Sequence, residues 1–386
     1  MPQKRPRVEI LSSIKRNRLL FCPVAIAAAI RGIGAVWLYH LLSLGGEFHT
    51  AWMDANPRLI PEWSPILNPS TSSNWLWLFN AWDSLHFQLI AQLGYSFPDY
   101  VYLPGYPIFI RMVGFMVGNY WLGGFLVAQI FALASLVVFQ LLAEQYMQPR
   151  EALCATLLMA TFPYISVFTI LGYSEAVFLF STIATWYFYK KGQIGTSSLL
   201  AGLASITRIY GLAIVLPMCL DIVRSKNYRK LLYLAIPVAF VASWFLFCYA
   251  STGDPFASWT DEKWFTSNID SKDGLVQTIL SQALKGVIGC CTLDPGILIA
   301  VGLFAYLVVK TWQVDGSLSI YAVTVFASVT STATNHLALL RFLTFLFPVW
   351  LTIKVRNLVV VAGCIAFFVP VTLLLWLYAI NVTFIG

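Results

Sequence analysis

The chain has 386 residues, of which 59% are hydrophobic and 11% are charged, and its formal net charge is +7. Several windows of about 20 nearly uncharged residues exclude a soluble globular domain, which could not keep so much apolar surface away from water. The basic residues gather near the N-terminus and in short loops, which indicates membrane topology and excludes a nucleic-acid-binding stripe. We therefore expect an all-α, polytopic membrane protein with a single domain over residues 1–386.

The N-terminal stretch predicts a basic cytoplasmic tail and a first membrane span. The tail covers residues 1–18, and the apolar run after it, at about 19–44, is too long for a cleavable signal and has no clear small-residue cleavage site. The polar stretch at 45–74, rich in Pro, Ser and Asn, then has to lie on the extracytoplasmic side. It opens the first extracytoplasmic loop, which we expect to cover residues 45–118.

Two short helices are expected in this loop, both lying at the outer membrane surface. In residues 80–94, Asp83 and His86 are three positions apart on one face of an amphipathic helix that Gly94 ends. The second helix, at 106–118, is short for a membrane crossing and carries an arginine. We expect the first helix to point an acid at a water-accessible cavity.

The positive-inside rule orders the rest of the chain and predicts about eleven spans in total. Basic residues on both sides of 197–223 require that stretch to go out and come back, as two short helices broken near 207–211. A second extracytoplasmic loop is expected at 251–293, where several acids gather. The other expected spans are at about 119–143, 152–171, a return span ending at 190, 231–250, 296–309, 318–332, 340–353 and 358–380.

Four ionisable residues map to the outer ends of the expected spans. A charge at membrane depth costs roughly 2.5–3.5 kcal/mol on insertion scales, so such residues are candidates for function. Each also has a structural explanation: the aspartate as a cap or ion-pair partner, the glutamate as an acid favoured in the first turn of a helix, and the arginines as ion-pair partners. His86 is interpreted as a hydrogen-bonding neighbour of the aspartate. The four residues are Asp83, Glu175, Arg208 and Arg341.

Together these residues suit the transfer of a sugar from a phosphate leaving group. The acid would take the proton of the acceptor hydroxyl, and the guanidinium groups would hold the departing phosphate. A lipid tail on the substrate would explain why the site belongs in a bilayer. Two alternatives stay open on these residues alone. One is a secondary transporter or flippase for a lipid-linked anion, which also uses broken helices and buried arginines, and the other is a non-catalytic assembly subunit.

Metal and disulfide chemistry is not indicated. Most of the seven cysteines fall inside apolar segments, where they read as small core residues. None of the four histidines lies within helical reach of another, and no D-x-D pair is present. We expect no metal site and no cofactor, with a role for a divalent cation left open.

The motif W-D-x-x-H-F, followed by I-A-x-x-G-Y and P-G-Y-P, resembles the mannosyltransferases related to the GPI second-mannosyltransferase (PIG-V) family, within the GT-C glycosyltransferases. Weaker matches follow in order over most of the chain. The matched positions are Trp82, Asp83, His86, Phe87, Ile90, Ala91, Gly94, Tyr95, Pro104 and Pro107, then Tyr173, Ser174 and Glu175, then Arg208 and Gly211, then 253–256, and finally Arg341 with Pro348.

The resemblance implies an inverting mannosyltransferase with a GT-C-like fold and a site on the extracytoplasmic or lumenal face. It implies a polyprenyl- or dolichyl-phosphate mannose donor and a lipid or lipid-linked glycan acceptor, and it puts Asp83 in the place of the general base. Ala81 stands where relatives often have Arg, which bears on the acceptor. Binding of the donor phosphate or substrate is expected from Arg208, Arg341, His86, Tyr173 and Glu175, and support from Trp82, Tyr95, Pro104 and Tyr106.

The expected location is a multi-pass position in the cell membrane of a prokaryote, or in the endoplasmic reticulum membrane of a eukaryote. The chain is short for the eukaryotic enzymes of GPI assembly, so the resemblance favours a prokaryotic, archaeal member. Nothing in the sequence identifies the acceptor or a partner subunit.

Overall fold

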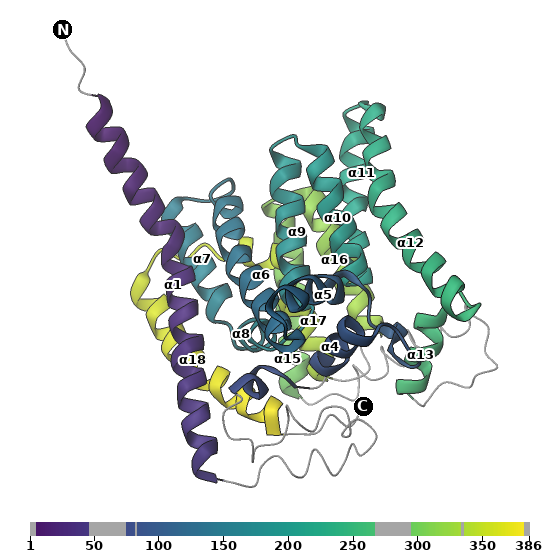
Figure 1. Cartoon of the computed structure of the whole chain (residues 1–386). Coiled ribbons are helices and arrows are strands. Elements are labelled where there is room, and N and C mark those ends of the chain that lie inside the picture. Colours follow the sequence, from purple (N-terminus) through teal and green to yellow (C-terminus); the bar gives the residue numbers. More distant parts are fainter. Residues whose placement is uncertain (1–4, 46–74, 82, 267–294, 333–335, 382–386) are drawn as a thin grey trace.

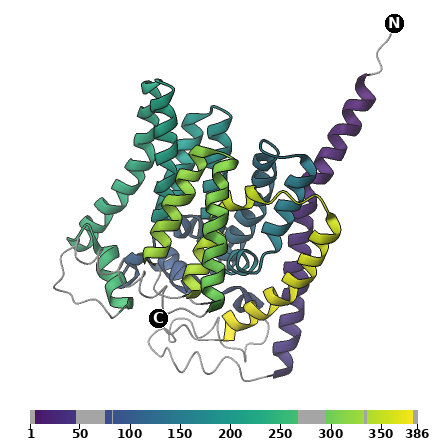
Figure 2. The same cartoon turned by 180° about the vertical axis from the view of Figure 1, so that it is seen from behind.

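The computed structural model describes residues 5–45, 75–81, 83–266, 295–332 and 336–381, and all regular elements in those ranges are helices. The predicted all-α class is confirmed for this part of the chain. Figure 1 shows a bundle with the N-terminus at the same end as the turn after α9 (Glu175–Lys190), whereas α4 (Asp83–Leu93) and α13 (Ala257–Thr266) lie at the other end. The view from behind in Figure 2 shows the same arrangement. We call the end with α4 the outer end and the opposite end the inner end.

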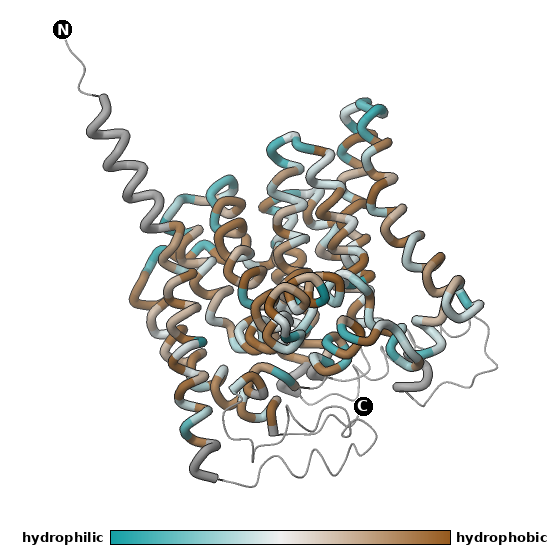
Figure 3. The backbone as a smooth tube through the Cα atoms, in the orientation of Figure 1, coloured by the Kyte–Doolittle hydropathy of each residue, from teal (hydrophilic) through white to brown (hydrophobic). Residues whose placement is uncertain are grey.

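Four helices in the described part of the chain are long and apolar enough to cross a membrane, so the protein is a multi-pass membrane protein. In Figure 3 hydrophobic residues dominate the lengths of the helices, and hydrophilic residues gather at the turns of the inner end. The four spans are Leu20–Leu41 within α1 (Arg5–Gly45), α6 (Tyr120–Ala143), Tyr228–Thr252 formed by η4 (Tyr228–Leu234) with α12 (Ala235–Thr252), and Leu358–Ile380 within α18 (Leu358–Asn381).

Another predicted span, at 152–171, is a bent pair of helices. α7 (Pro149–Thr161) and α8 (Pro163–Ile170) meet at an angle of 61°, and Pro163 stands at the bend. Proline lacks the N–H that would continue the helical hydrogen bonding, which explains the break. Counting this pair as one span raises the number of spans in the described residues to five.

The predicted break in the stretch 197–223 is confirmed. α10 (Ile194–Thr207) ends just before Arg208, and η3 (Ile209–Ile214) leads into α11 (Val215–Arg224). Arg208 has an extended backbone, with φ −148° and ψ 133°, so its side chain leaves the chain at the junction of two helices.

The predicted single span at 340–353 is wrong. That stretch is divided between α17 (His336–Thr344) and η6 (Phe347–Thr352), with Pro348 in the first turn of η6. The spans expected at 296–309 and 318–332 are short apolar helices, α15 (Pro295–Lys310) and α16 (Gly316–Thr332). The count of eleven spans is therefore not confirmed.

The two helices predicted in the first outer loop are present. α4 begins at Asp83 and ends where Gly94 takes a positive φ of 95°, and α5 (Gly105–Val117) follows after the short helix η2 (Asp99–Val101). Several predictions fall outside the described residues: Trp82, most of the polar stretch 45–74, and the larger part of the second outer loop at 251–293.

Helix α9 lies in the middle of the bundle and packs against α6 and α10. Residues 175–179 and 181–186 of this helix are all buried. Its hydroxyls are satisfied inside the helix, because Ser181, Thr182 and Thr185 each donate to the carbonyl four residues before them. A fixed central helix thus connects the outer end, at Glu175, with the inner end, at Lys190.

Candidate functional site

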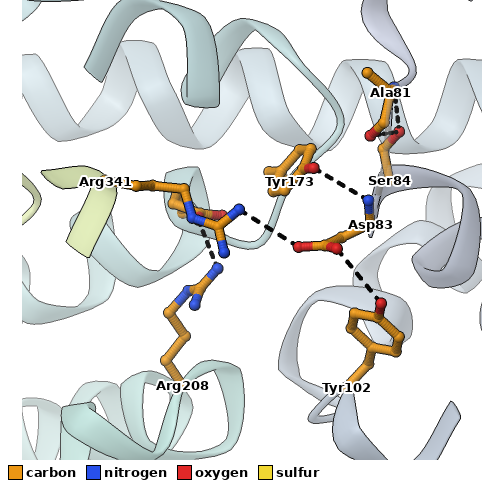
Figure 4. Close-up of polar contacts among 8 residues, drawn as sticks. Ala81, Asp83, Ser84, Tyr102, Tyr173, Arg208 and Arg341 are labelled. Carbon is orange, nitrogen blue, oxygen red and sulfur yellow. Dashed lines mark hydrogen bonds and ion pairs between the residues drawn. The ribbon is translucent and has the colours of Figure 1, made fainter. Parts of the chain in front are cut away.

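Asp83 is the first residue of α4, at the outer end of the bundle (Figure 4). A carboxylate at a helix N-terminus is favoured by the helix dipole. Hydrogen bonds restrain the backbone at the start of the helix. The backbone N–H of Asp83 donates to the Tyr173 hydroxyl at 3.1 Å, and the Ser84 hydroxyl accepts from the N–H of Ala81 at 2.7 Å and donates to its carbonyl at 2.8 Å. The backbone that carries the acid is therefore held in place.

The carboxylate of Asp83 is oriented but remains accessible. The Tyr102 hydroxyl donates to Oδ1 at 3.4 Å, and Nη1 of Arg341 lies 3.4 Å from Oδ2. Both contacts are longer than the roughly 2.7–2.9 Å of a strong charge-assisted hydrogen bond. The side chain is 22% exposed. Asp83 is thus neither locked in a tight ion pair nor turned into the core.

A second acid, Glu175, holds the two arginines together. Its Oε1 accepts from Nη2 of Arg208 at 2.5 Å and lies 3.1 Å from Nε of Arg341, and its side chain is only 1% exposed. A buried charge is tolerated when it is paired and hydrogen-bonded. Glu175 is therefore well placed to orient the arginines, and Asp83, at 22% exposed, is the more accessible of the two acids.

Aromatic rings also fix the two guanidinium groups. Arg208 lies 4.6 Å from the centre of the Phe342 ring, and Arg341 lies 4.8 Å from the same ring. Arg341 also lies 5.1 Å from the Phe168 ring and 5.3 Å from the Tyr173 ring. Such cation–π contacts stabilise a guanidinium group in one orientation.

The polar atoms of this cluster are not all satisfied. Within the described residues, Oε2 of Glu175 and Nε of Arg208 and Arg341 are buried without a hydrogen bond, and the 3.1 Å contact of Arg341 with Glu175 counts as an ion pair only. Burial alone would lower the pKa of Arg341, but the carboxylates of Glu175 and Asp83 raise it above its ordinary value. Unpaired polar atoms beside a firmly charged guanidinium are typical of a site that binds a polar group.

The P-G-Y-P motif, at residues 104–107, packs against the end of α10, next to Arg208. A Cβ atom at Gly105 would lie 2.3 Å from Oγ1 and 2.8 Å from Cα of Thr207, so glycine is needed where α5 meets the end of α10. The ring of Tyr106 is fully buried, and its hydroxyl donates to the carbonyl of Gly124 at 2.9 Å. The motif thereby fixes the residue that precedes Arg208.

The structure places the remaining predicted residues around the loop between α4 and α5. Nδ1 of His86 lies 2.8 Å from Oδ1 of Asp99, and the His86 ring stacks on Tyr102. Tyr95 donates to the carbonyl of Tyr102 at 2.8 Å. The sequence analysis missed Asp99 and Tyr102. The available signal was an acid and two tyrosines within four residues of a loop that joins two predicted helices.

An apolar groove of about 430 Å³ lies between α4, α5 and α12. It begins about 10 Å from Asp83, since Ile90 lies seven residues further along α4. A cavity of about 10 Å³, the size of one water, lies beside Glu175 and Arg208. The predicted water-accessible cavity beside the acid of α4 is not confirmed, because Asp83 lines neither of these two cavities. The residues around the groove include Ile90, Pro104, Pro107, Trp244 and Phe247, with Arg111 as the charged one.

In the part of the chain that the structure describes, no three His, Cys, Asp or Glu residues are grouped so that they could hold a metal ion. The positive charges at the site come from Arg208 and Arg341. The metal-free site stays a prediction.

Among characterised proteins, the chain is similar to GPI alpha-1,6-mannosyltransferase 2 of mouse, with 33% identity over 145 residues, and of rat, with 32% identity over 148 residues. The mouse alignment covers 34% of this chain and 29% of the relative, and the rat alignment covers 35% and 30%. The chain therefore matches less than a third of the length of these relatives.

Two solved structures align with the chain over most of its length. ArnT from Cupriavidus metallidurans in the apo state gives a TM-score of 0.47 with 13% identity, over 75% of this chain and 59% of that chain. The Archaeoglobus fulgidus oligosaccharyltransferase gives a TM-score of 0.42 with 15% identity, over 79% of this chain and 47% of that chain.

A family model described as mannosyltransferase (PIG-V) matches residues 38–252, which is more than half of the chain. The match contains Asp83, Glu175 and Arg208, whereas Arg341 lies beyond it. By this match the chain belongs to the mannosyltransferase (PIG-V) family.

Proposed function

We propose that this protein is an inverting mannosyltransferase of GT-C-like architecture. Its donor is a polyprenyl- or dolichyl-phosphate mannose, its acceptor is a lipid or lipid-linked glycan, and Asp83 is the general base. One observation carries the proposal: the accessible carboxylate of Asp83 lies 3.4 Å from Arg341, which shares the buried Glu175 with Arg208. A proton acceptor and two phosphate-binding groups are thus side by side.

In this reaction the oxygen of the acceptor hydroxyl attacks C1 of the mannose. Asp83 takes the hydroxyl proton, the bond between C1 and the phosphate oxygen breaks, and its electron pair leaves with the lipid phosphate. Attack on the face opposite the phosphate inverts the configuration at C1. The N–H groups of Arg208 and Arg341 that do not face Glu175 bind the departing phosphate, where a bidentate guanidinium contact is strongest.

The groove between α4, α5 and α12 supports a substrate with a lipid chain. Its volume of about 430 Å³ and its mostly apolar lining suit a prenyl or acyl chain. The positive-inside rule puts Lys190, Lys191 and the basic residues at 224–230 in the cytoplasm, so the site faces the extracytoplasmic or lumenal side. The membrane is the cell membrane in a prokaryote or the endoplasmic reticulum membrane in a eukaryote.

The other two functions have less support. A transporter would need its binding charges near the middle of its spans, whereas Asp83 and Glu175 begin helices at the outer end and Arg208 lies between two helices. A buried arginine does lie mid-span in α1, Arg31, but its guanidinium donates to Gln129 and Thr169 of neighbouring helices. A non-catalytic subunit would leave Asp83 paired or buried with no adjoining cavity. Asp83 lines neither of the two cavities described above, but its carboxylate is 22% exposed and 3.4 Å from its partners.

The test is transfer of labelled mannose from a lipid phosphate by purified Asp83→Asn protein. The amide has the same shape but cannot take the proton, so the rate should fall at least about a hundredfold. Asp221→Asn is a matched control at the inner end, because Asp221 is 25% exposed, lies 4.0 Å from Arg224 and accepts from the Ser317 hydroxyl. A normal rate for Asp83→Asn, with a folded protein, would remove the general base from the proposal.

A further inference from the structure

Tyr102, which was not predicted from the sequence, has both its backbone N–H and its carbonyl hydrogen-bonded. It follows η2 in the loop between α4 and α5, and its N–H donates to the carbonyl of Asp99 at 3.0 Å. Its own carbonyl accepts from the Tyr95 hydroxyl at 2.8 Å. These two hydrogen bonds restrain the backbone at Tyr102, and the restrained backbone limits where the ring can lie.

The ring is also held between two side chains of α4. His86 stacks on it with ring centres 4.9 Å apart and an angle of 19°, and Phe87 meets it edge-on at 5.0 Å. The His86 ring is in turn fixed, because its Nδ1 lies 2.8 Å from Oδ1 of Asp99. The second oxygen of Asp99 accepts from the Ser96 hydroxyl at 3.4 Å. Each ring is thus restrained by a neighbour that is itself bonded.

The same loop is connected to the second outer loop. The N–H of Tyr100 donates to Oδ2 of Asp261 in α13 at 2.9 Å, and Asp261 is buried. The Tyr100 ring packs against Trp244 of α12. The short helix before Tyr102 therefore has anchors on two other elements of the outer end.

We propose that Tyr102 is a positioning residue for Asp83, and that the hydrogen-bonded pair of His86 and Asp99 holds Tyr102 in place. The proposal rests on the proposed role of Asp83 as the base. The terminal torsion of an aspartate side chain is broadly distributed, so a carboxylate needs a fixed donor on one oxygen to aim the other. Tyr102 supplies that donor at 3.4 Å from Oδ1. His86 then acts through Tyr102 and not on the donor phosphate.

The protonation of Tyr102 fits this role. Burial raises the pKa of Tyr102 well above its ordinary value, and the charge of Asp83 raises it further. The hydroxyl keeps its proton at neutral pH and is available as a donor to the carboxylate.

The test is Tyr102→Phe, which keeps the ring and removes the hydroxyl. We expect kcat to fall about tenfold with the donor KM unchanged, because a hydrogen bond to a charged group is lost but the substrate contacts are kept. The same change made in Asp83→Asn protein should lower the residual rate no further, since two residues that act through one another are not additive. Tyr100→Phe is the matched control, two residues earlier in the same loop, and should leave kcat unchanged.

The role of His86 is tested by a pair of variants. His86→Ala removes the stacking ring and should lower kcat severalfold, whereas His86→Phe restores a ring over Tyr102 and should recover part of the loss. Variants are compared only when they elute and melt like the wild type. If Asp83→Asn is slow but Tyr102→Phe is normal, or if the two losses multiply, this inference is wrong and the proposed function stands. If Asp83→Asn itself is normal, both this inference and the general-base role of Asp83 are wrong.

Discussion

Each end of α9 carries a cluster of charged and polar side chains, and the two clusters differ in whether their buried polar atoms are all hydrogen-bonded. At the inner end, Nζ of Lys190 lies 2.6 Å from Oδ2 of Asp315, which also accepts from the Tyr146 hydroxyl at 2.8 Å. That hydroxyl accepts from the Trp186 indole at 3.0 Å. We call these four residues the inner cluster. Although burial alone would raise it, hydrogen bonds from Lys190 and Tyr146 hold the pKa of Asp315 below its ordinary value.

The outer cluster, formed by Asp83, Glu175, Arg208 and Arg341, is about 22 Å away along the same helix. Its contacts run from 2.5 Å to 3.4 Å, and three of its buried polar atoms lack hydrogen bonds. Among the described residues, none of the buried atoms without a partner belongs to the inner cluster. A fully satisfied cluster contributes rigidity, whereas a partly satisfied one at an accessible end can bind a substrate.

The largest effect is expected from Glu175→Gln, which removes the charge that both arginines share. Breaking a buried ion pair by changing one partner costs about 3–5 kcal/mol, so the free energy of unfolding should fall by that order and transfer should become undetectable. Thermal unfolding in detergent and a transfer assay measure the two effects. Glu144→Gln, a half-buried glutamate at the end of α6, is the control and should change neither. Normal transfer by Glu175→Gln would contradict its role as the holder of the arginines.

An intermediate effect, on stability alone, is expected from Asp315→Asn. The amide still caps the N-terminus of α16, where Oδ1 accepts from the N–H groups of Ser317 and Leu318, but it loses the ion pair with Lys190. Because Lys190 is a third exposed, the cost should be only about 1–2 kcal/mol. The folded protein should keep its wild-type kcat and donor KM. A tenfold fall in kcat per folded molecule would contradict the interpretation that the inner cluster contributes to stability alone.

The elements that could be predicted from the sequence are those with local signals. Gly94 ends α4, and the basic residues on both sides of 197–223 required the broken pair of helices whose junction carries Arg208. The stretch 340–353 was wrongly predicted as one span because most of it is apolar. Pro348, in the first turn of η6, is the sequence signal of the break.

The contacts that complete the site could not be predicted in the same way. Asp83 and Arg341 are 258 positions apart, and no periodicity connects them. Tyr102 and Asp99 lie in a loop, where side-chain direction does not follow from helical spacing. His86 shares a helix with Asp83, yet its hydrogen bond to Asp99 depends on how that loop folds back. Spacing identified the chemical groups of the site, and tertiary packing decides which of them meet.

The smallest effect on transfer at the outer end, and the sharpest comparison of the two ends, comes from removing one cation at each. Arg208→Ala breaks the 2.5 Å ion pair with Glu175, so the free energy of unfolding should also fall, and it leaves Glu175 with its 3.1 Å contact to Arg341. In the proposed reaction the change removes a donor for the departing phosphate, so the donor KM of the folded protein should rise about tenfold. The acceptor KM should change by less than twofold. Lys190→Ala removes a cation from the inner cluster and should change neither constant.

The two KM values are measured by varying donor and acceptor separately at saturating levels of the other substrate. An arginine that only supports the fold would raise both constants together in the folded protein. An arginine that binds the phosphate acts on the donor alone, because in the proposed inverting reaction the acceptor hydroxyl approaches from the opposite face of the sugar. Equal changes in both constants for Arg208→Ala would therefore mean that Arg208 has a structural role, as the residues of the inner cluster do. Arg341 would then be the remaining candidate for the phosphate ligand.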